Sequence, residues 1–103
     1  MLVSFKEIIE GADKGGYAVP AFNVYNMETV MGASKAAEEA KAPVILQIYP
    51  RLVLEESGYY VASLIKAAAA KLNVPICLHL DHGPNMTAVE RMISWERPAL
   101  CTI

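Results

Sequence analysis

The sequence predicts an α/β fold built from parallel βα units, and three observations lead to this prediction. Short apolar runs that suit buried strands alternate with longer segments of helical periodicity. A proline stands at the entry to each apolar run, at Pro20, Pro43 and Pro75. No GxGxxG or GxxxxGKS/T motif follows any of these runs, which disfavours a nucleotide-binding open sheet. Strands that alternate with helices along a chain form parallel sheets.

The first predicted element is a short helix near the N-terminus. Ser4 and Glu7 have the spacing of a capping box, in which each residue satisfies a backbone N–H at the start of a helix. The pair Gly15 and Gly16 ends the pattern. We therefore expect a helix that runs to about Lys14.

The first two strands and the helix between them follow. Residues 17–24 are predicted to form a strand. Asn26 suits the cap of a second helix over about residues 27–41, whose apolar side chains share one broad face. Residues 43–49 are continuously apolar, which is typical of a strand buried on both faces. Residues 50–57 are predicted to form a loop.

The third unit is predicted on the same grounds. A helix that ends near Leu72 has apolar residues spaced by three and four positions. Residues 74–81 are predicted to form the third strand. Gly83 and Pro84 open a fourth helix that runs to about Ile93, because proline suits the first helical turn.

Two architectures fit this order of elements, an open doubly wound sheet and a TIM (β/α)8 barrel. For a barrel, residues 1–93 would supply the N-terminal helix and about three of the eight units. A whole barrel needs roughly 250 residues, so the predicted barrel is incomplete. Residues 94–103 form a tail that departs from the pattern, since Pro98 interrupts it without a clear helix stop.

Composition excludes several classes of function. The chain has 103 residues, 54% of them hydrophobic, and a net charge of −2, so it offers one small domain and no basic surface for nucleic acid. Its apolar runs are too short to span a membrane, and its first residues do not resemble a signal peptide. Its two cysteines, Cys77 and Cys101, form no CxxC pair, so we expect a buried reduced thiol at Cys77 and a cytoplasmic location.

The motif richest in chemistry is His-Leu-Asp-His-Gly at residues 79–83, where the third strand gives way to a loop. His79 and Asp81 share one face of a strand. The turn after it can bring His82 beside Asp81, where a neutral imidazole suits Zn²⁺ and the carboxyl group can transfer a proton. His79 suits either a packed, hydrogen-bonded role or a ligand role, and a polar strand end without function is the remaining interpretation. Zinc catalysis needs about three protein ligands, and the chain has only two histidines, so further ligands must come from elsewhere.

Three blocks together resemble the class II, zinc-dependent ketose-bisphosphate aldolases, which include the fructose-bisphosphate and tagatose-bisphosphate enzymes. They are Val-Pro-Ala-Phe-Asn-Val at 19–24, Ala-Pro-Val-Ile-Leu-Gln at 42–47, and Val-Pro-Ile-Cys-Leu-His-Leu-Asp-His-Gly at 74–83. The resemblance covers residues 1–93 and implies the N-terminal part of a TIM barrel.

The resemblance also implies roles for individual residues. His82 falls at the position of a zinc ligand, and Asp81 at that of the catalytic proton donor. Asn23 matches a residue that orients the substrate, although a strand-end amide bonded to a loop is an equally good interpretation. His79 and Gln47 are expected to give structural support. Zinc would act as a Lewis acid on the substrate ketone.

The implied activity is the reversible aldol cleavage of fructose or tagatose 1,6-bisphosphate to dihydroxyacetone phosphate and glyceraldehyde 3-phosphate, a lyase reaction of carbohydrate metabolism. The resemblance implies a phosphorylated sugar substrate, one Zn²⁺ and a homodimer or homotetramer. Because the match fails near Ser94, we expect a truncated or frameshifted member without full activity. A non-catalytic, self-associating βα fragment and another metal-dependent TIM-barrel enzyme are the alternatives.

Overall fold

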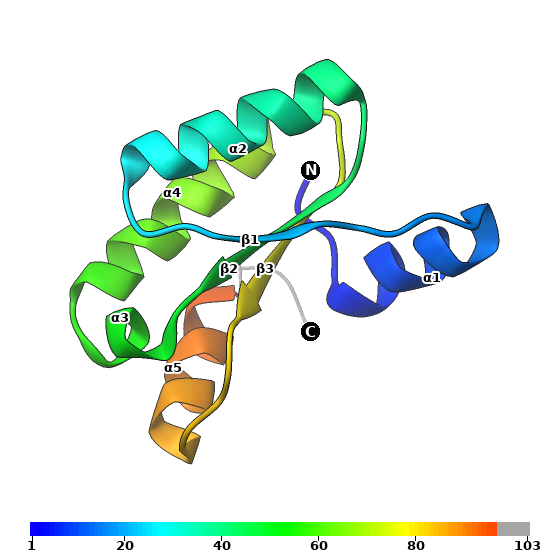
Figure 1. The fold of residues 1–103 in the computed structure, drawn as a ribbon. Coiled ribbons are helices and arrows are strands. Elements are labelled where there is room, and N and C mark those ends of the chain that lie inside the picture. The colour runs from blue at the N-terminus through cyan, green and yellow to red at the C-terminus, as the bar shows by residue number, and fades with distance from the viewer. Residues whose placement is uncertain (97–103) are drawn as a thin grey trace.

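The structure is a computed structural model that describes residues 1–96. Within this range, three parallel strands form one sheet in the order β1-β2-β3, and five helices accompany it (Figure 1). In chain order, the elements are α1 (Phe5–Gly15), β1 (Ala21–Asn23), α2 (Met27–Ala40), β2 (Val44–Ile48), α3 (Pro50–Leu54), α4 (Ser57–Lys71), β3 (Ile76–Leu80) and α5 (Met86–Glu96). The predicted alternation of helices and parallel strands is confirmed.

Side chains at the helix ends explain where α1 begins and ends. The Ser4 hydroxyl accepts a hydrogen bond from the Glu7 N–H at 3.1 Å, and the Ser4 N–H donates to the Glu7 carboxylate at 2.9 Å. This is the predicted capping box. Gly16 ends the helix with a φ of 68°, a left-handed conformation that glycine adopts without a steric penalty.

The second helix has a similar start and a less favourable end. The Asn26 side chain accepts from the Thr29 N–H at 2.9 Å, as expected for the cap of α2. Lys41 ends this helix with a φ of 51°. A lysine thus adopts the left-handed conformation in which most helices place glycine.

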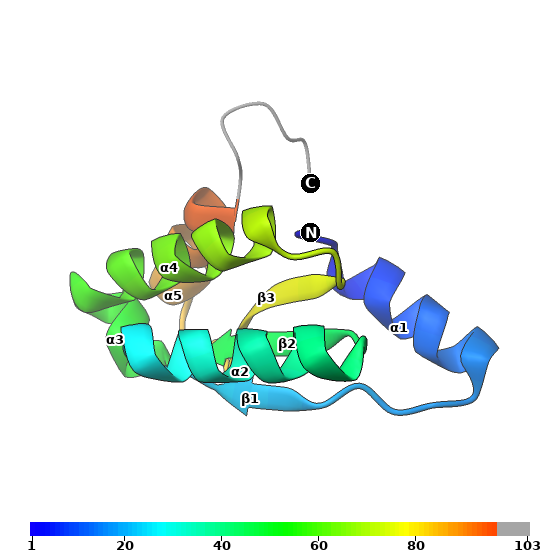
Figure 2. The same ribbon diagram turned by 90° about the horizontal axis from the view of Figure 1, so that it is seen from above.

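The hydrophobic core divides between the two faces of the sheet. On one face, Leu46, Ile48 and Ile76 are wholly buried beneath α2, α4 and α5. On the other face, Ile45 and Cys77 pack against Ile8 of α1. Figure 2 shows α1 standing apart from the other four helices. The sheet is therefore covered deeply on one face and by a single helix on the other.

Two predicted boundaries were wrong in the first half of the chain. The strand expected at 17–24 is only Ala21–Asn23, because β1 lies at the sheet edge and pairs solely with Ile45–Gln47 of β2. The loop expected at 50–57 contains the short helix α3. Pro50 is its first residue, a position that the fixed φ of proline favours.

The last helix also differs from its predicted limits. It begins at Met86 rather than at Gly83 and Pro84, and the Asn85 side chain accepts from the Ala88 N–H at 2.9 Å. It continues to Glu96, so the first residues of the expected 94–103 tail belong to α5. The rest of that tail, from residue 97, lies outside the described residues.

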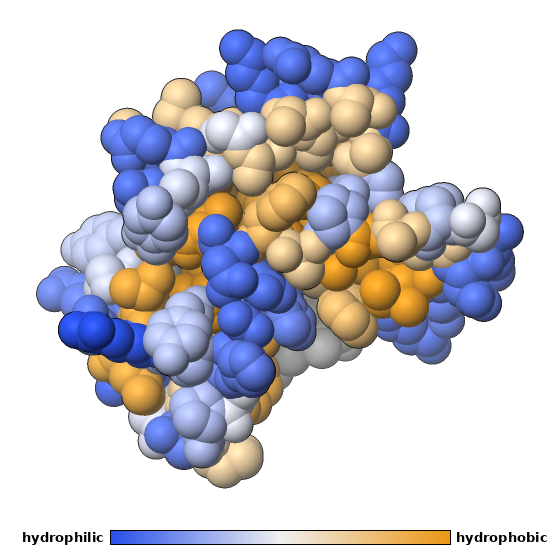
Figure 3. All heavy atoms as spheres, viewed as in Figure 1, coloured by the Kyte–Doolittle hydropathy of each residue, from blue (hydrophilic) through white to orange (hydrophobic). Residues whose placement is uncertain are grey.

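The surface carries large apolar side chains that the sheet and helices leave uncovered. Hydrophobic residues gather over β1 and beside α1, on either side of a hydrophilic band (Figure 3). Two of the large exposed side chains are Phe22 of β1 and Tyr25 just after it, with exposed fractions of 48% and 62%. None of the helices in the described range is both long and apolar enough to cross a membrane.

Candidate active site

A row of polar side chains crosses the sheet near the carboxyl ends of its strands. Asn23 of β1 pairs in register with Gln47 of β2, and Gln47 pairs with His79 of β3. Because residues at the same register position share one face of a sheet, the three side chains lie side by side. Parallel βα folds place their chemistry at this end of the strands.

Hydrogen bonds join this row from one strand to the next. The Asn23 Nδ2 group donates to Asp81 Oδ2 at 2.9 Å, and Gln47 Nε2 donates to Asn23 Oδ1 at 2.9 Å. His79 Nδ1 lies 3.3 Å from Gln47 Oε1. We call these four residues, Asn23, Gln47, His79 and Asp81, the polar row. Three sequence blocks that lie far apart in the chain thus form one connected network.

His82 lies just beyond this row, where the strand ends. The Asp81 N–H donates to the Ile48 carbonyl at 2.9 Å, which keeps Asp81 attached to β2. The next residue, His82, has a φ of 64°, and its Nε2 lies 3.6 Å from Asp81 Oδ1. The chain therefore turns sharply after Asp81 and directs the imidazole back beside the carboxylate.

Exposure and backbone strain distinguish these two residues. The Asp81 side chain is 25% exposed, whereas the His82 side chain is 80% exposed. A positive φ costs a non-glycine residue of order 1 kcal/mol, and such strained residues concentrate at functional sites. The strained turn leaves a solvent-accessible imidazole next to a partly buried carboxylate.

His79 is held by packing as well as by its hydrogen bond. Its ring stacks on Phe5 of α1, with the ring centroids 5.3 Å apart and the planes at 24°. Phe5 is not among the site residues that the sequence predicts. Sequence patterns indicate which face of α1 is apolar, but they do not indicate which strand residue that face will meet.

The residues present can be compared with the needs of a zinc ion. An exposed imidazole beside a carboxylate has suitable chemistry for Zn²⁺. Within residues 1–96, however, no three His, Cys, Asp or Glu side chains lie close enough together to hold a metal. The described part of the chain therefore fits part of a zinc site.

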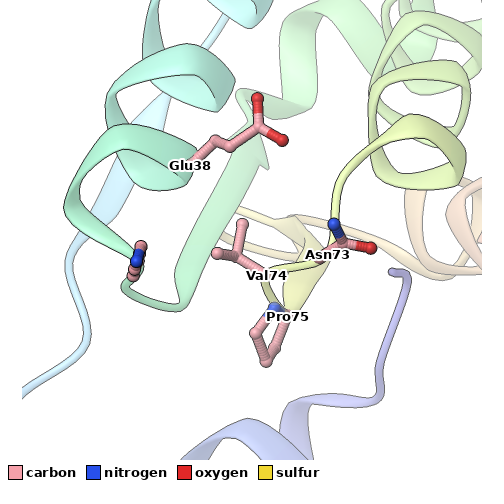
Figure 4. A pocket seen from close by; sticks show the side chains of 5 residues that line it. Glu38, Asn73, Val74 and Pro75 are labelled. Atoms are coloured by element: carbon pink, nitrogen blue, oxygen red, sulfur yellow. The ribbon is translucent and has the colours of Figure 1, made fainter.

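A separate hollow lies at the opposite end of the sheet. It has a volume of about 390 Å³ and is lined by Glu38, Lys41, Asn73, Val74 and Pro75 (Figure 4). These residues belong to the end of α2 and to the segment before β3, whereas the polar row lies at the strands' carboxyl ends. The hollow is therefore separate from the candidate site.

Comparison with known proteins identifies the class of fold and then the family. The chain aligns with the YdjI aldolase of Escherichia coli K12 with a TM-score of 0.84 and 34% identity, covering 92% of this chain and 37% of that one. A fructose-bisphosphate aldolase from Campylobacter jejuni, 23% identical, aligns with a TM-score of 0.76 over 90% of this chain and 32% of its own, and it supports the fold alone. The three parallel strands are thus part of a TIM barrel, and the open doubly wound sheet is excluded.

The family follows from the sequence match. Residues 3–97 match the model of the class II fructose-bisphosphate aldolases, and the chain belongs to this family. A fructose-bisphosphate aldolase from Giardia intestinalis is 39% identical over 93 residues, which are 89% of this chain and 29% of that protein. The chain thus spans about a third of the length of the relatives it matches.

Proposed function

We propose that this chain supplies part of the active site of a zinc-dependent aldolase that cleaves a ketose bisphosphate, either fructose or tagatose 1,6-bisphosphate. Family membership supports an aldol reaction. The observation that carries the proposal is the pairing of Asp81 with His82 at the end of β3, 3.6 Å apart.

In this proposal, His82 binds the metal and Asp81 handles the proton. Zinc, when bound, would supply Lewis-acid polarisation of the substrate ketone. Asp81 gives its proton to the aldehyde oxygen as the carbon–carbon bond forms, and takes it back from the hydroxyl group during cleavage. Two hydrogen bonds hold Asp81 in position: the Asn23 amide donates to its carboxylate, and the Asp81 N–H donates to the Ile48 carbonyl of β2.

Asn23 is proposed to orient the substrate. Its amide carries two N–H groups and the bond to Asp81 uses one of them, so the other can bind a substrate oxygen. His79 and Gln47 support the site. Further metal ligands and the phosphate-binding groups would come from outside the described residues, in a cytoplasmic homodimer or homotetramer.

The proposal is tested by an aldol-cleavage assay with added Zn²⁺. The assay uses the 103-residue chain and the product of the whole reading frame that contains it. We expect turnover from the longer product, and little or none from the short chain. If the longer product cleaves neither ketose bisphosphate in the presence of Zn²⁺, the proposal is wrong.

Two substitutions in the active product separate the proposed roles. Asp81→Ala should lower kcat by about 10²-fold to 10⁴-fold, the usual contribution of a general acid, and should leave the zinc content nearly unchanged. His82→Ala should remove both turnover and zinc. Asp13→Ala, which removes an exposed carboxylate of α1, is the control and should change neither. If the Asp81 variant lost its zinc and the His82 variant kept it, the two residues would have the opposite roles from those proposed.

A further inference from the structure

The hydrogen bonds of the polar row have a direction that follows from the chemistry of its members. When Asp81 is ionised, its carboxylate can only accept hydrogen bonds, so Asn23 must face it with the NH₂ group, at the observed distance of 2.9 Å. The carbonyl oxygen of Asn23 then faces Gln47, which must present its own NH₂ group, again at 2.9 Å. Each amide is thereby fixed in one of its two orientations.

The direction of these hydrogen bonds also determines the protonation of His79, at the far end of the polar row. With its NH₂ group directed at Asn23, Gln47 presents Oε1 to the histidine, at 3.3 Å from Nδ1. An amide oxygen only accepts, so the histidine nitrogen that faces it must carry the proton. Free neutral imidazole side chains favour the other tautomer, with the proton on Nε2. The row therefore selects the less common form.

The packing of His79 fixes the plane of its imidazole ring beside Gln47. The ring stacks on Phe5 at a centroid distance of 5.3 Å, and the backbone of β3 is paired with β2 at this residue. A half-turn of the ring would keep this stacking contact but would exchange Nδ1 for a carbon atom, so the hydrogen bond to Gln47 selects the orientation with Nδ1 toward its oxygen. The helix α1 therefore helps to fix the orientation of the His79 ring at the carboxyl ends of the strands.

We propose that His79 and Gln47 are positioning residues that hold the Asn23 amide with its N–H toward Asp81, and that His79 does so as its Nδ1–H tautomer. If the Asn23 amide turned over, its carbonyl oxygen would face the carboxylate and repel it. The histidine prevents this turn through Gln47, without touching Asp81 itself. The tautomer is inferred from geometry alone, whereas its value for catalysis rests on the function proposed above.

The tautomer can be measured directly by nuclear magnetic resonance of the chain with ¹⁵N-labelled histidine. The chain has only two histidines, so each serves as a reference for the other. We expect His79 in the Nδ1–H form and the exposed His82 in the usual Nε2–H form at a pH where both rings are neutral. If both rings show the Nε2–H form in a chain whose resonances are dispersed as in a folded protein, the proposal is wrong.

Three variants test the chain of contacts through the exchange rate of the Asn23 side-chain amide protons. Gln47→Met keeps the length of the side chain and removes its hydrogen bonds, so exchange should rise about fivefold, the usual worth of one hydrogen bond. Gln47→Met should also return His79 to the Nε2–H form. His79→Leu should raise the exchange rate similarly.

His79→Asn is the conservative rescue. Its amide N–H can replace the Nδ1–H group, so the Asn23 amide protons should keep their slow exchange. Equal exchange rates in the His79→Leu and His79→Asn variants would refute the role of the His79 Nδ1–H group as a donor to Gln47. These readouts do not depend on turnover. An inactive reading-frame product with the expected tautomer would refute the proposed function alone, whereas an active product with the Nε2–H form would refute the polar-row inference alone.

Discussion

Gly58 and Gly32 offer a matched test of the packing between α3 and α4. Both glycines lie in helices, and both receive the same methyl group when replaced by alanine. A Cβ on Gly58 would overlap the Leu52 carbonyl oxygen, and would lie 2.7 Å from its carbon and 2.9 Å from Val53 Cα. A Cβ on Gly32 would meet nothing within 4 Å.

The expected effects have opposite signs. In an exposed helix interior, alanine is more favourable than glycine by about 0.5–1 kcal/mol, so Gly32→Ala should stabilise the chain by that amount. At Gly58, the added methyl group must displace backbone rather than a flexible side chain. Overpacking of this kind costs about 1–3 kcal/mol, which exceeds the gain in helix preference. Because both variants gain the same helix preference, they should differ by the overpacking cost, about 1–3 kcal/mol.

Urea denaturation followed by circular dichroism measures this difference. The midpoint should rise for Gly32→Ala and fall for Gly58→Ala, and Gly58→Ser should fall at least as far because its side chain is larger. A Gly58→Ala variant as stable as Gly32→Ala would show that α4 does not approach α3 as closely as described.

Three further predictions concern other parts of the chain. Lys41→Gly should raise the free energy of unfolding by about 0.5–1 kcal/mol, because Lys41 ends α2 in the left-handed conformation, and a Lys41→Ala control should show no gain in urea denaturation. Burial lowers the pKa of the Met1 amino group below its usual 8.0, so just below pH 8 the unfolded chain binds more protons than the folded chain. The free energy of unfolding should therefore rise with pH between the folded-state pKa and pH 8, and acetylation of the N-terminus should remove this rise. Because Phe22 and Tyr25 are exposed beside an edge strand, the 103-residue chain should self-associate with increasing concentration in sedimentation experiments, and a strictly monomeric chain would contradict this.

Much of the fold could be predicted because local signals agreed with the tertiary structure. The Ser4–Glu7 box and the Asn26 cap fix two helix starts through contacts within four residues. The apolar run of β2 reflects its central place, where both faces are buried. Where a boundary depended on a neighbour, as at β1, the local pattern was too long, since strand length is set by the residues available for pairing.

The candidate site could be predicted only in part. Alternation along β3 indicated that His79 and Asp81 share a face, and the glycine and proline after His82 indicated a sharp turn. The register between strands was not available from the sequence, so the bonds from Gln47 to Asn23 and His79 could not be foreseen. The stacking of Phe5 depends on where α1 docks, which is a tertiary property.

The first three residues of the chain form hydrogen bonds with the start of β3 and with the segment before it. The Met1 amino group donates to the carbonyls of Leu72 and Val74, at 2.7 and 2.8 Å, and Ile76 bonds the backbone of Met1 and Val3. A ribosome that adds roughly 5–20 residues per second needs ~4–15 s to reach Ile76. During synthesis, residues 1–3 therefore stay without their Ile76 hydrogen bonds for this time, and α1 can complete its packing against the sheet only after β3 has been made.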